Sequence, residues 1–228
     1  MTKKTTRKAA GASRPKRMRK TGSSSARTQL LEMLVTKSYR RSDTPSFRLA
    51  SGKLSDFYID CKATTMCGQA MPLVGEVFAQ QLPDGVDAVG GLTMGADPIA
   101  HAIAHYSAAH GTPLNAFSVR KEPKKHGTRK WIEGGVETGS KVVVLDDVVT
   151  TGGSTIDAIR KCREEGLRVV AVMALVDRQE EGGLEAIRQV AGPDIPVRAI
   201  FTKSDFAAFP KSSGDPPASS AAHRTAAG

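Results

Sequence analysis

Apolar residues along this chain form two recurring patterns, short uninterrupted runs and stretches with a helical repeat. β-Branched runs are typical of strands buried on both faces of a parallel sheet, and a repeat of three to four residues is typical of amphipathic helices. Beyond residue 82 the two patterns alternate, with strands expected at 86–90, 114–119, 141–145, 168–176 and 196–201 and helices at 96–109, 153–165 and 182–190. The alternation predicts an α/β fold with a mainly parallel central sheet flanked by helices.

The part of the chain before residue 82 has shorter elements. Ser25 is suited to cap a helix that continues through Val35. Two short strands are expected at 47–50 and 57–61, and a helix at 71–81 follows them. These small elements precede the regular alternation of strand and helix.

Positive charge is concentrated in residues 1–27, which contain ten Lys or Arg and no acid. The rest of the chain has 23 basic and 23 acidic residues, so the pI of about 9.7 reflects this tail. We predict a disordered, solvated arm at 1–27, with nonspecific anion contact or organelle targeting as its functional alternatives. Residues 209–228, rich in Pro, Ser and Ala, are predicted to form a second disordered tail, which leaves one domain at 28–208. The near-neutral domain argues against specific nucleic-acid binding.

Two further patterns concern the compartment of the protein. No apolar run has the length of a membrane span or the form of a secretory signal. The cysteines, Cys61, Cys67 and Cys162, are odd in number and lack metal-ligand spacing, which favours reduced thiols in a cytoplasmic protein without membrane association.

The most informative segment spans residues 141–155 and reads KVVVLDDVVTTGGST. An apolar run at 142–145 precedes Asp146 and Asp147, and a turn of small residues at 150–154 follows them. Glycines, hydroxyls and the N-terminus of a helix are suited to hold a phosphate, whereas two acids are suited to accept hydrogen bonds from a sugar diol. The segment therefore predicts a pocket for a sugar phosphate. The plainer alternative is a strand, turn and helix with acidic capping residues.

Two charged segments come after predicted strands. Four basic residues and one His lie within residues 120–126, where they form either a cationic lid that neutralises a pyrophosphate or a solvated surface loop. Arg178 follows the strand at 168–176 and offers a planar fork for a carboxylate, unless it only pairs with Asp177 at the surface.

Two weaker signals complete the set. The aromatic pair Phe57 and Tyr58 forms either a wall for a flat ring or part of the core. A Gly-rich strand-to-helix turn at 90–99 can offer backbone N–H groups to a diphosphate.

In this order and spacing, the five segments resemble the orotate phosphoribosyltransferases, which use phosphoribosyl diphosphate (PRPP), over about residues 30–190. The resemblance implies the type I phosphoribosyltransferase fold, with a small N-terminal hood on the sheet. It also implies the reversible transfer of the 5-phosphoribosyl group from PRPP to orotate in pyrimidine biosynthesis. Mg²⁺ is expected on the diphosphate, with no metal site made by the protein alone. A homodimer is expected, in which a lid at about 121–135 serves the neighbouring subunit.

The resemblance assigns roles residue by residue. Lys124, His126, Asp146 and Asp147 are the implied catalytic residues, and Thr150 and Arg178 are the implied contacts to orotate. The implied PRPP contacts are Arg120, Lys121, Lys124, His126, Asp146, Asp147, Val148, Val149, Thr150, Thr151, Gly152, Gly153 and Ser154.

The chain departs from the family pattern at two positions. Ala50 and Gly95 stand where many or some members carry a cation, and Lys53 is the candidate substitute. Three other functions stay open from the residues alone: a phosphoribosyltransferase for another base, a non-catalytic PRPP-sensing regulator and a plain nucleotide-binding module.

Overall fold

A computed structural model describes residues 23–48, 52–123, 130–207 and 209. Its centre is a six-stranded sheet in the order β10-β9-β8-β5-β6-β7. All neighbouring strands pair in parallel except β6 and β7, which are antiparallel. The strands are β5 (Ala88–Leu92), β6 (Asn115–Val119), β7 (Ile132–Gly134), β8 (Lys141–Val149), β9 (Arg168–Asp177) and β10 (Val197–Thr202). The predicted mainly parallel α/β fold is confirmed.

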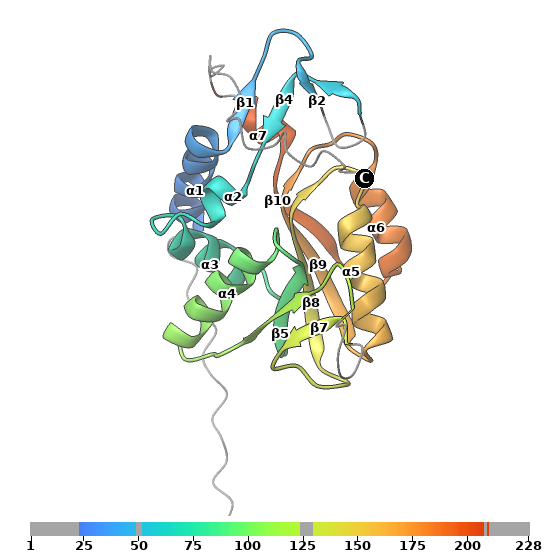
Figure 1. Ribbon diagram of the computed structural model, residues 1–228. Helices are drawn as coiled ribbons and strands as arrows, with labels where there is room; N and C mark the ends of the chain where they lie inside the picture. The colour runs from blue at the N-terminus through green and yellow to red at the C-terminus, as the bar shows by residue number, and fades with distance from the viewer. Residues whose placement is uncertain (1–22, 49–51, 124–129, 208, 210–228) are drawn as a thin grey trace, which may run out of the picture.

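Helices cover both faces of this sheet (Figure 1). The helices α1 (Ser23–Lys37), α3 (Met71–Ala79) and α4 (Asp97–Ala109) pack on one face, and α5 (Gly153–Glu164) and α6 (Gly183–Ala191) pack on the other. Strand β8 contributes to both cores, because side chains alternate along a strand. Val143 and Leu145 join the first core, whereas Val142 and Val144 join the second. The uninterrupted apolar run thus reflects burial on two sides.

A small hood lies at the carboxyl edge of the sheet, at the top of Figure 1. Strand β1 (Tyr39–Arg41) pairs antiparallel with β4 (Phe57–Ile59), and β2 (Phe47–Arg48) pairs antiparallel with β3 (Leu54–Ser55). The short helices α2 (Lys62–Thr65) and α7 (Lys203–Phe206) complete this region. The rings of Tyr39, Phe57 and Phe206 pack together with centroids 5.2–6.1 Å apart and belong to the core on the first face of the sheet, so the hood is continuous with that core.

Several elements differ from the sequence prediction. Strand β8 continues to residue 149 rather than ending at 145, so both acids lie within it. Strands β1, β3 and β7 and helices α2 and α7 were not predicted, since each spans two to four residues and has too few positions to show a period. Helix α1 begins at Ser23, two residues before the predicted cap at Ser25. No described helix has the length and apolarity needed to cross a membrane, and the cysteines are free thiols.

Candidate active site

The two acids of the β8 segment lie at the carboxyl edge of the sheet. Strand β8 pairs with β5 as far as Leu145, and it then continues beside β9, where Asp146 lies opposite Ala174. The acids therefore extend beyond β5 and lie beside the Gly-rich turn that follows it. A Cβ atom at Gly95 in that turn would come within 2.4 Å of the Asp147 carboxylate, so only glycine fits there with the acid in its present position.

Asp146 is buried and held by local hydrogen bonds. The Thr155 hydroxyl donates to Oδ2 at 2.6 Å, and the backbone N–H of Asp147 donates to Oδ1 at 2.9 Å. Burial raises the pKa of Asp146 to about 7, and the charge of Asp147 adds to this effect, whereas the bond from Thr155 opposes it. The negative charge of Asp146 is thus sensitive to pH near neutrality.

Asp147 has a cationic neighbour that sequence reasoning missed. Lys62 Nζ, on α2, lies 2.8 Å from Asp60 Oδ1 and 3.8 Å from Asp147 Oδ2. Partial burial alone would lower the pKa of Lys62, but the hydrogen bond to Asp60 and the charge of Asp147 raise it. A basic residue just after a strand of the hood was the only signal in the sequence. Lys62 brings a positive charge to the acids, near the turn where Gly95 supplies none.

The phosphate turn, residues 150–154, joins β8 to α5. Gly152 is the N-cap and has a φ of 81°, and a Cβ atom there would lie 2.7 Å from the Gly183 carbonyl oxygen. A glycine is therefore required both by the backbone angle and by the close packing of α6. No side chain caps α5, and Thr151, Gly153 and Ser154 are exposed. The Gly153 N–H donates to Thr151 Oγ1 at 3.4 Å, whereas the N–H groups of Ser154 and Thr155 have no helical partner and are suited to an anion.

The predicted PRPP contacts at 148–154 divide between two elements. Val148 and Val149 belong to β8, and the side chain of Val149 is buried, so this residue can offer a ligand only its backbone. Gly153 and Ser154 belong to the first turn of α5. Thr150 is half-buried between them.

Arg178 follows β9, and its backbone N–H donates to the Val149 carbonyl at 3.0 Å, which places it next to the phosphate turn. Its side chain is 5% exposed. Nε donates to Glu180 Oε2 at 2.9 Å, and Nη2 donates to the Phe57 carbonyl at 2.7 Å and to Ser55 Oγ at 3.3 Å. Nη1 has no hydrogen bond to any described residue and remains for a ligand.

Glu180 holds this arrangement together. Its Oε1 accepts hydrogen bonds from Ser55 Oγ at 3.1 Å and from Lys203 Nζ at 3.0 Å. Burial alone would raise the pKa of Glu180, but hydrogen bonds from Lys203 and Arg178 lower it. We call Arg178, Glu180, Ser55, Phe57 and Lys203 the Arg178 cluster. It links β9 to the hood and to α7.

The surface alternative for Arg178, pairing with Asp177, is wrong. Asp177 instead accepts the backbone N–H of Gln179 at 3.0 Å, and Glu180 is the partner of the buried guanidinium. Phe57 is 1% exposed and lies under Arg178, whose guanidinium carbon is 4.6 Å from the ring centroid. Phe57 is thus a core residue that also supports Arg178. Tyr58 is half-buried and lies beside the Phe47 ring.

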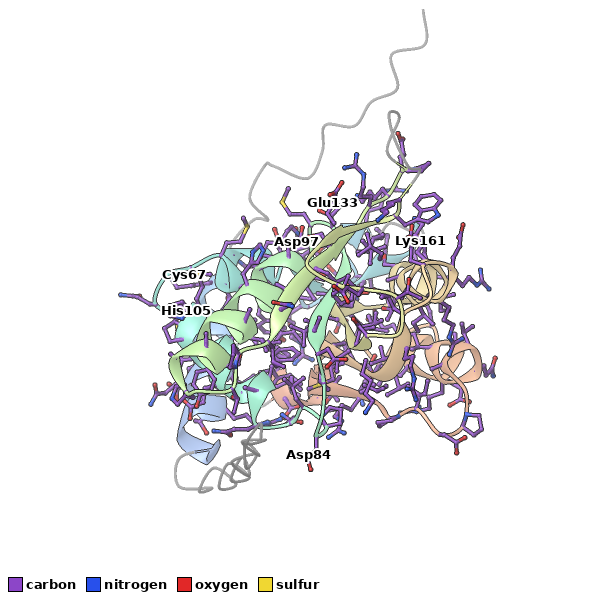
Figure 2. The ribbon with its side chains drawn as sticks, turned by 90° about the horizontal axis from the view of Figure 1, so that it is seen from below. Cys67, Asp84, Asp97, His105, Glu133 and Lys161 are labelled. Carbon is purple, nitrogen blue, oxygen red and sulfur yellow. The ribbon has the colours of Figure 1, made fainter. Side chains whose placement is uncertain are left out.

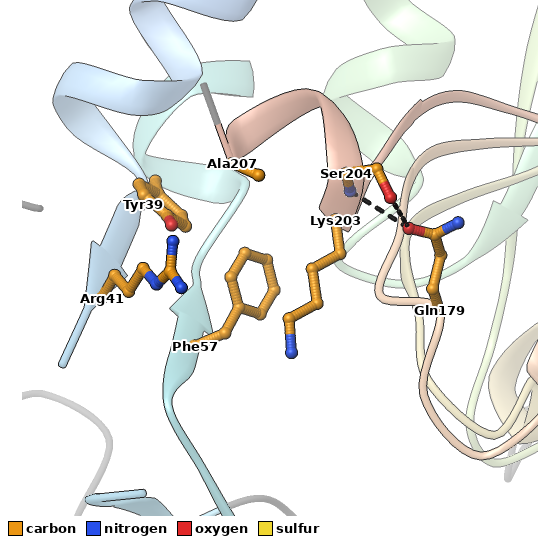
Figure 3. Close-up of a pocket in the computed structure, with 7 residues that line it drawn as sticks. All are labelled: Tyr39, Arg41, Phe57, Gln179, Lys203, Ser204 and Ala207. Atoms are coloured by element: carbon orange, nitrogen blue, oxygen red, sulfur yellow. Dashed lines mark hydrogen bonds between the residues drawn. The ribbon is translucent and has the colours of Figure 1, made fainter. Parts of the chain in front are cut away.

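A cavity of about 230 Å³ opens beside the Arg178 cluster (Figure 3). Its lining includes Phe57 and Lys203 of the cluster, together with Tyr39, Arg41 and Gln179. None of the predicted substrate contacts lines it. The cavity therefore borders the back of the cluster rather than the acids or the phosphate turn.

The lid segment is described only at its ends. Arg120 donates through Nη1 to Glu133 Oε1 on β7 at 3.1 Å and through Nε to the Glu122 carbonyl at 3.2 Å. Lys121 is exposed. Lys124 and His126 lie outside the described residues, as does Ala50. Lys53, the candidate substitute cation, pairs with Glu181 at 3.3 Å rather than with a predicted site residue.

The described residues contain no group of three or more His, Cys, Asp or Glu that could hold a metal ion. Asp146 is occupied by Thr155 and by a backbone N–H, and Asp147 pairs with Lys62. This donor set fits a cation held mainly by substrate oxygens and water rather than a protein cage.

Comparisons with known proteins agree with this geometry. The phosphoribosyl transferase domain family matches residues 70–200. Orotate phosphoribosyltransferase from Aquifex aeolicus is 44% identical over 181 residues, covering 79% of this chain and 97% of the relative. The Sorangium cellulosum enzyme of the same name is also 44% identical, over 80% of this chain and 93% of the relative. A crystal structure of Mycobacterium tuberculosis orotate phosphoribosyltransferase in complex with PRPP has a TM-score of 0.62 and 31% identity, covering 79% of this chain and 91% of that one. The chain belongs to the orotate phosphoribosyltransferase family.

Proposed function

We propose that this chain transfers the 5-phosphoribosyl group of PRPP to orotate, giving orotidine 5′-monophosphate and pyrophosphate, in pyrimidine biosynthesis. The observation that carries the proposal is the continuous unit of Asp146, Asp147 and the uncapped N-terminus of α5 at the carboxyl edge of the sheet. Ligands bind at this edge in sheets of this type. Family membership supports the same reaction.

The two acids are proposed to hold the ribose. Carboxylate oxygens accept hydrogen bonds from the 2- and 3-hydroxyls of the sugar, and the α5 N-terminus with Thr151 and Ser154 holds the 5-phosphate. When the bond at the anomeric carbon breaks, positive charge develops on the ring. The negative charges of Asp146 and Asp147 stabilise that charge, and no covalent nucleophile is required.

Arg178 is proposed to orient orotate. Its Nη1 faces no protein acceptor among the described residues, whereas Nε and Nη2 are held by Glu180, Ser55 and Phe57. The guanidinium is therefore fixed before the ligand arrives, and it can donate to the orotate carboxylate without a change of rotamer. Thr150 lies at the start of the phosphate turn, and it is proposed to contact both PRPP and orotate.

Cations of three kinds are proposed to contact the leaving pyrophosphate and to stabilise its negative charge. Arg120, Lys121, Lys124 and His126 would come from the lid, and Lys62 from the hood. Mg²⁺ bound to the diphosphate oxygens would supply additional positive charge. Because Lys62 is 43% exposed and lies beside Asp147, it is the described cation best placed to compensate for Gly95.

We further propose a cytoplasmic homodimer in which residues of about 121–135 serve the partner's site. The support is the family resemblance and the polar character of this stretch. The domain is proposed to span 28–208, between two tails.

A substrate panel tests the proposed function. Purified protein is mixed with PRPP, Mg²⁺ and one of orotate, uracil, adenine or hypoxanthine, and base consumption is followed by absorbance. Consumption of orotate alone supports the proposal. Preferential use of a purine would indicate a phosphoribosyltransferase for another base, and PRPP binding without turnover of any base would indicate a sensor.

A further inference from the structure

Lys161 is a lysine with a buried side chain that the proposed chemistry does not use. It lies on α5, two turns after the phosphate turn, and its side chain is only 8% exposed. Figure 2 labels it on α5, and Glu133 lies on the neighbouring β7. A buried ammonium group is costly unless each of its donors finds an acceptor.

All three donors of Lys161 have acceptors. Nζ donates to the Arg120 carbonyl at 3.0 Å, to the Lys121 carbonyl at 3.3 Å and to Asp157 Oδ2 at 2.8 Å. It also lies 4.2 Å from the centre of the Trp131 ring, within range of a cation–π interaction. The ammonium therefore contacts both ends of the segment that runs from residue 120 to residue 131.

Other bonds fix the same two ends to each other and to α5. The Arg120 N–H donates to the Trp131 carbonyl at 2.8 Å. The Trp131 N–H donates to Glu165 Oε1, at the end of α5, at 2.8 Å. The helix that begins at the phosphate turn thus holds the backbone from which Arg120 and Lys121 project.

We propose that Lys161 is a positioning residue for the diphosphate half of PRPP. It fixes the backbone at Arg120 relative to α5, and so relative to the 5-phosphate bound at the other end of the helix. The same ammonium holds Lys121 at the start of the segment that is proposed to serve the partner's site. The inference rests on the proposed function, because it assigns Arg120 and Lys121 to the diphosphate. It concerns only the described ends of the segment.

The test compares Lys161→Met with Lys161→Arg and with Arg160→Met, an exposed position on the same helix. Met keeps an unbranched chain but cannot donate, whereas Arg keeps charge and donors. We expect kcat/KM for PRPP to fall about 10- to 100-fold in Lys161→Met, the scale of a misplaced catalytic contact. KM for orotate should stay within about twofold, and Lys161→Arg, which keeps the charge and the donors, should lose less than Lys161→Met.

Fluorescence gives a second reading, because Trp131 is the only tryptophan of the chain. Its emission should shift in Lys161→Met but not in Arg160→Met, and the affinity for magnesium pyrophosphate, titrated by this signal, should fall about tenfold or more. If Lys161→Met does not fold, Glu165→Met decides, because it removes the acceptor of the Trp131 N–H: a loss confined to PRPP supports the inference, and unchanged kinetics overturn it.

Three results would overturn the inference: unchanged PRPP kinetics in Lys161→Met, equal losses for PRPP and orotate, or the same loss in Arg160→Met. Failure of the proposed function is seen separately. In that case the wild-type protein would not consume orotate with PRPP and Mg²⁺, whatever the variants do.

Discussion

The phosphate turn and the Arg178 cluster lie at the ends of neighbouring strands, but they leave different groups free for a ligand. At the phosphate turn, an uncapped helix N-terminus and exposed residues stay open. In the Arg178 cluster, Glu180, Ser55 and Phe57 occupy two of the three guanidinium nitrogens. The phosphate turn offers backbone groups whose positions depend on one short segment of the sequence. The Arg178 cluster offers one side chain, that of Arg178, which residues from distant parts of the chain hold in place.

This difference predicts that substitutions in the phosphate turn and in the Arg178 cluster impair the binding of different substrates. Damage to the phosphate turn should come from backbone changes and should affect PRPP. Damage to the Arg178 cluster should come from charge changes, including changes at residues that never touch a ligand, and should affect orotate.

The largest effect is expected from Gly152→Ala. The new methyl group would collide with the Gly183 carbonyl and the Ile187 side chain while the backbone keeps a φ of 81°. The turn must then move, and kcat/KM for PRPP should fall about 100-fold, as expected for a displacement near 1 Å. Steady-state kinetics with varied PRPP measure this loss.

Gly111→Ala is the matched control, because Gly111 has a φ of 77° with open space around its Cβ position. It carries similar backbone strain of about 1–3 kcal/mol without the collision. Its melting temperature should fall while PRPP kinetics stay near wild type. Equal kinetic losses in the two variants would show that backbone strain, rather than the collision with Gly183 and Ile187, causes the loss in Gly152→Ala.

Arg178→Ala should produce the next largest effect, on orotate. Loss of one partner of a buried, charge-assisted pair costs about 2–5 kcal/mol, which corresponds to about 30-fold or more in orotate affinity. PRPP affinity should change little. Calorimetric titration with each substrate measures both values, and the exposed Arg188→Ala serves as the control. Weaker PRPP binding with normal orotate binding would assign Arg178 to the wrong ligand.

Glu180→Gln should have a smaller effect of the same kind. Gln keeps the shape but loses the charge that holds Arg178 Nε and Lys203. KM for orotate should rise about three- to tenfold, since hydrogen bonds to charged groups contribute about 1.5–3 kcal/mol and only part of that is lost. The exposed Glu185→Gln is the control. An unchanged KM would mean that the bonds of Nη2 and the packing on Phe57 are enough to orient Arg178.

A different kind of effect concerns pH and Asp146. Its pKa is about 7 in the folded state because of burial, and near 3.9 when unfolded. The unfolded state loses this proton first, so the stability linked to Asp146 is fully present below about pH 4 and is lost as pH rises to about 7. Asp146→Asn should therefore lose less unfolding free energy than wild type between pH 5 and pH 8 in urea titrations.

PRPP affinity should change in the opposite direction, because the ribose hydroxyls need an ionised acceptor. Wild-type affinity should rise about tenfold from pH 6 to pH 8, because the ionised fraction of a carboxyl group of pKa 7 rises about tenfold over that range. Asp146→Asn should lack that component. Parallel pH profiles in the two proteins would assign the titration to another group.

Sequence alone predicted five of the six strands of the central sheet. The apolar run of β8, the two acids and the Gly-Gly turn are adjacent along the chain, so the sequence could predict that they lie together. Lys62, Glu180 and Lys161 were missed because their partners are distant: Glu180 contacts Ser55 across 125 positions, and Lys161 contacts Arg120 across 41. Local patterns carry no information on such pairs. The end of β8 was misplaced because Asp146 and Asp147 interrupt the apolar run, although their backbone stays paired with β9.

The proposed transfer of the phosphoribosyl group to orotate is tested most directly by following the phosphorus-containing species of one reaction. Wild-type protein is incubated with PRPP, orotate and Mg²⁺, and ³¹P NMR resolves PRPP, pyrophosphate and the nucleotide phosphate. We expect one pyrophosphate and one orotidine 5′-monophosphate for each orotate consumed, and no loss of PRPP when orotate is omitted. Hydrolysis of PRPP to ribose 5-phosphate, or persistence of PRPP with orotate present, would contradict it.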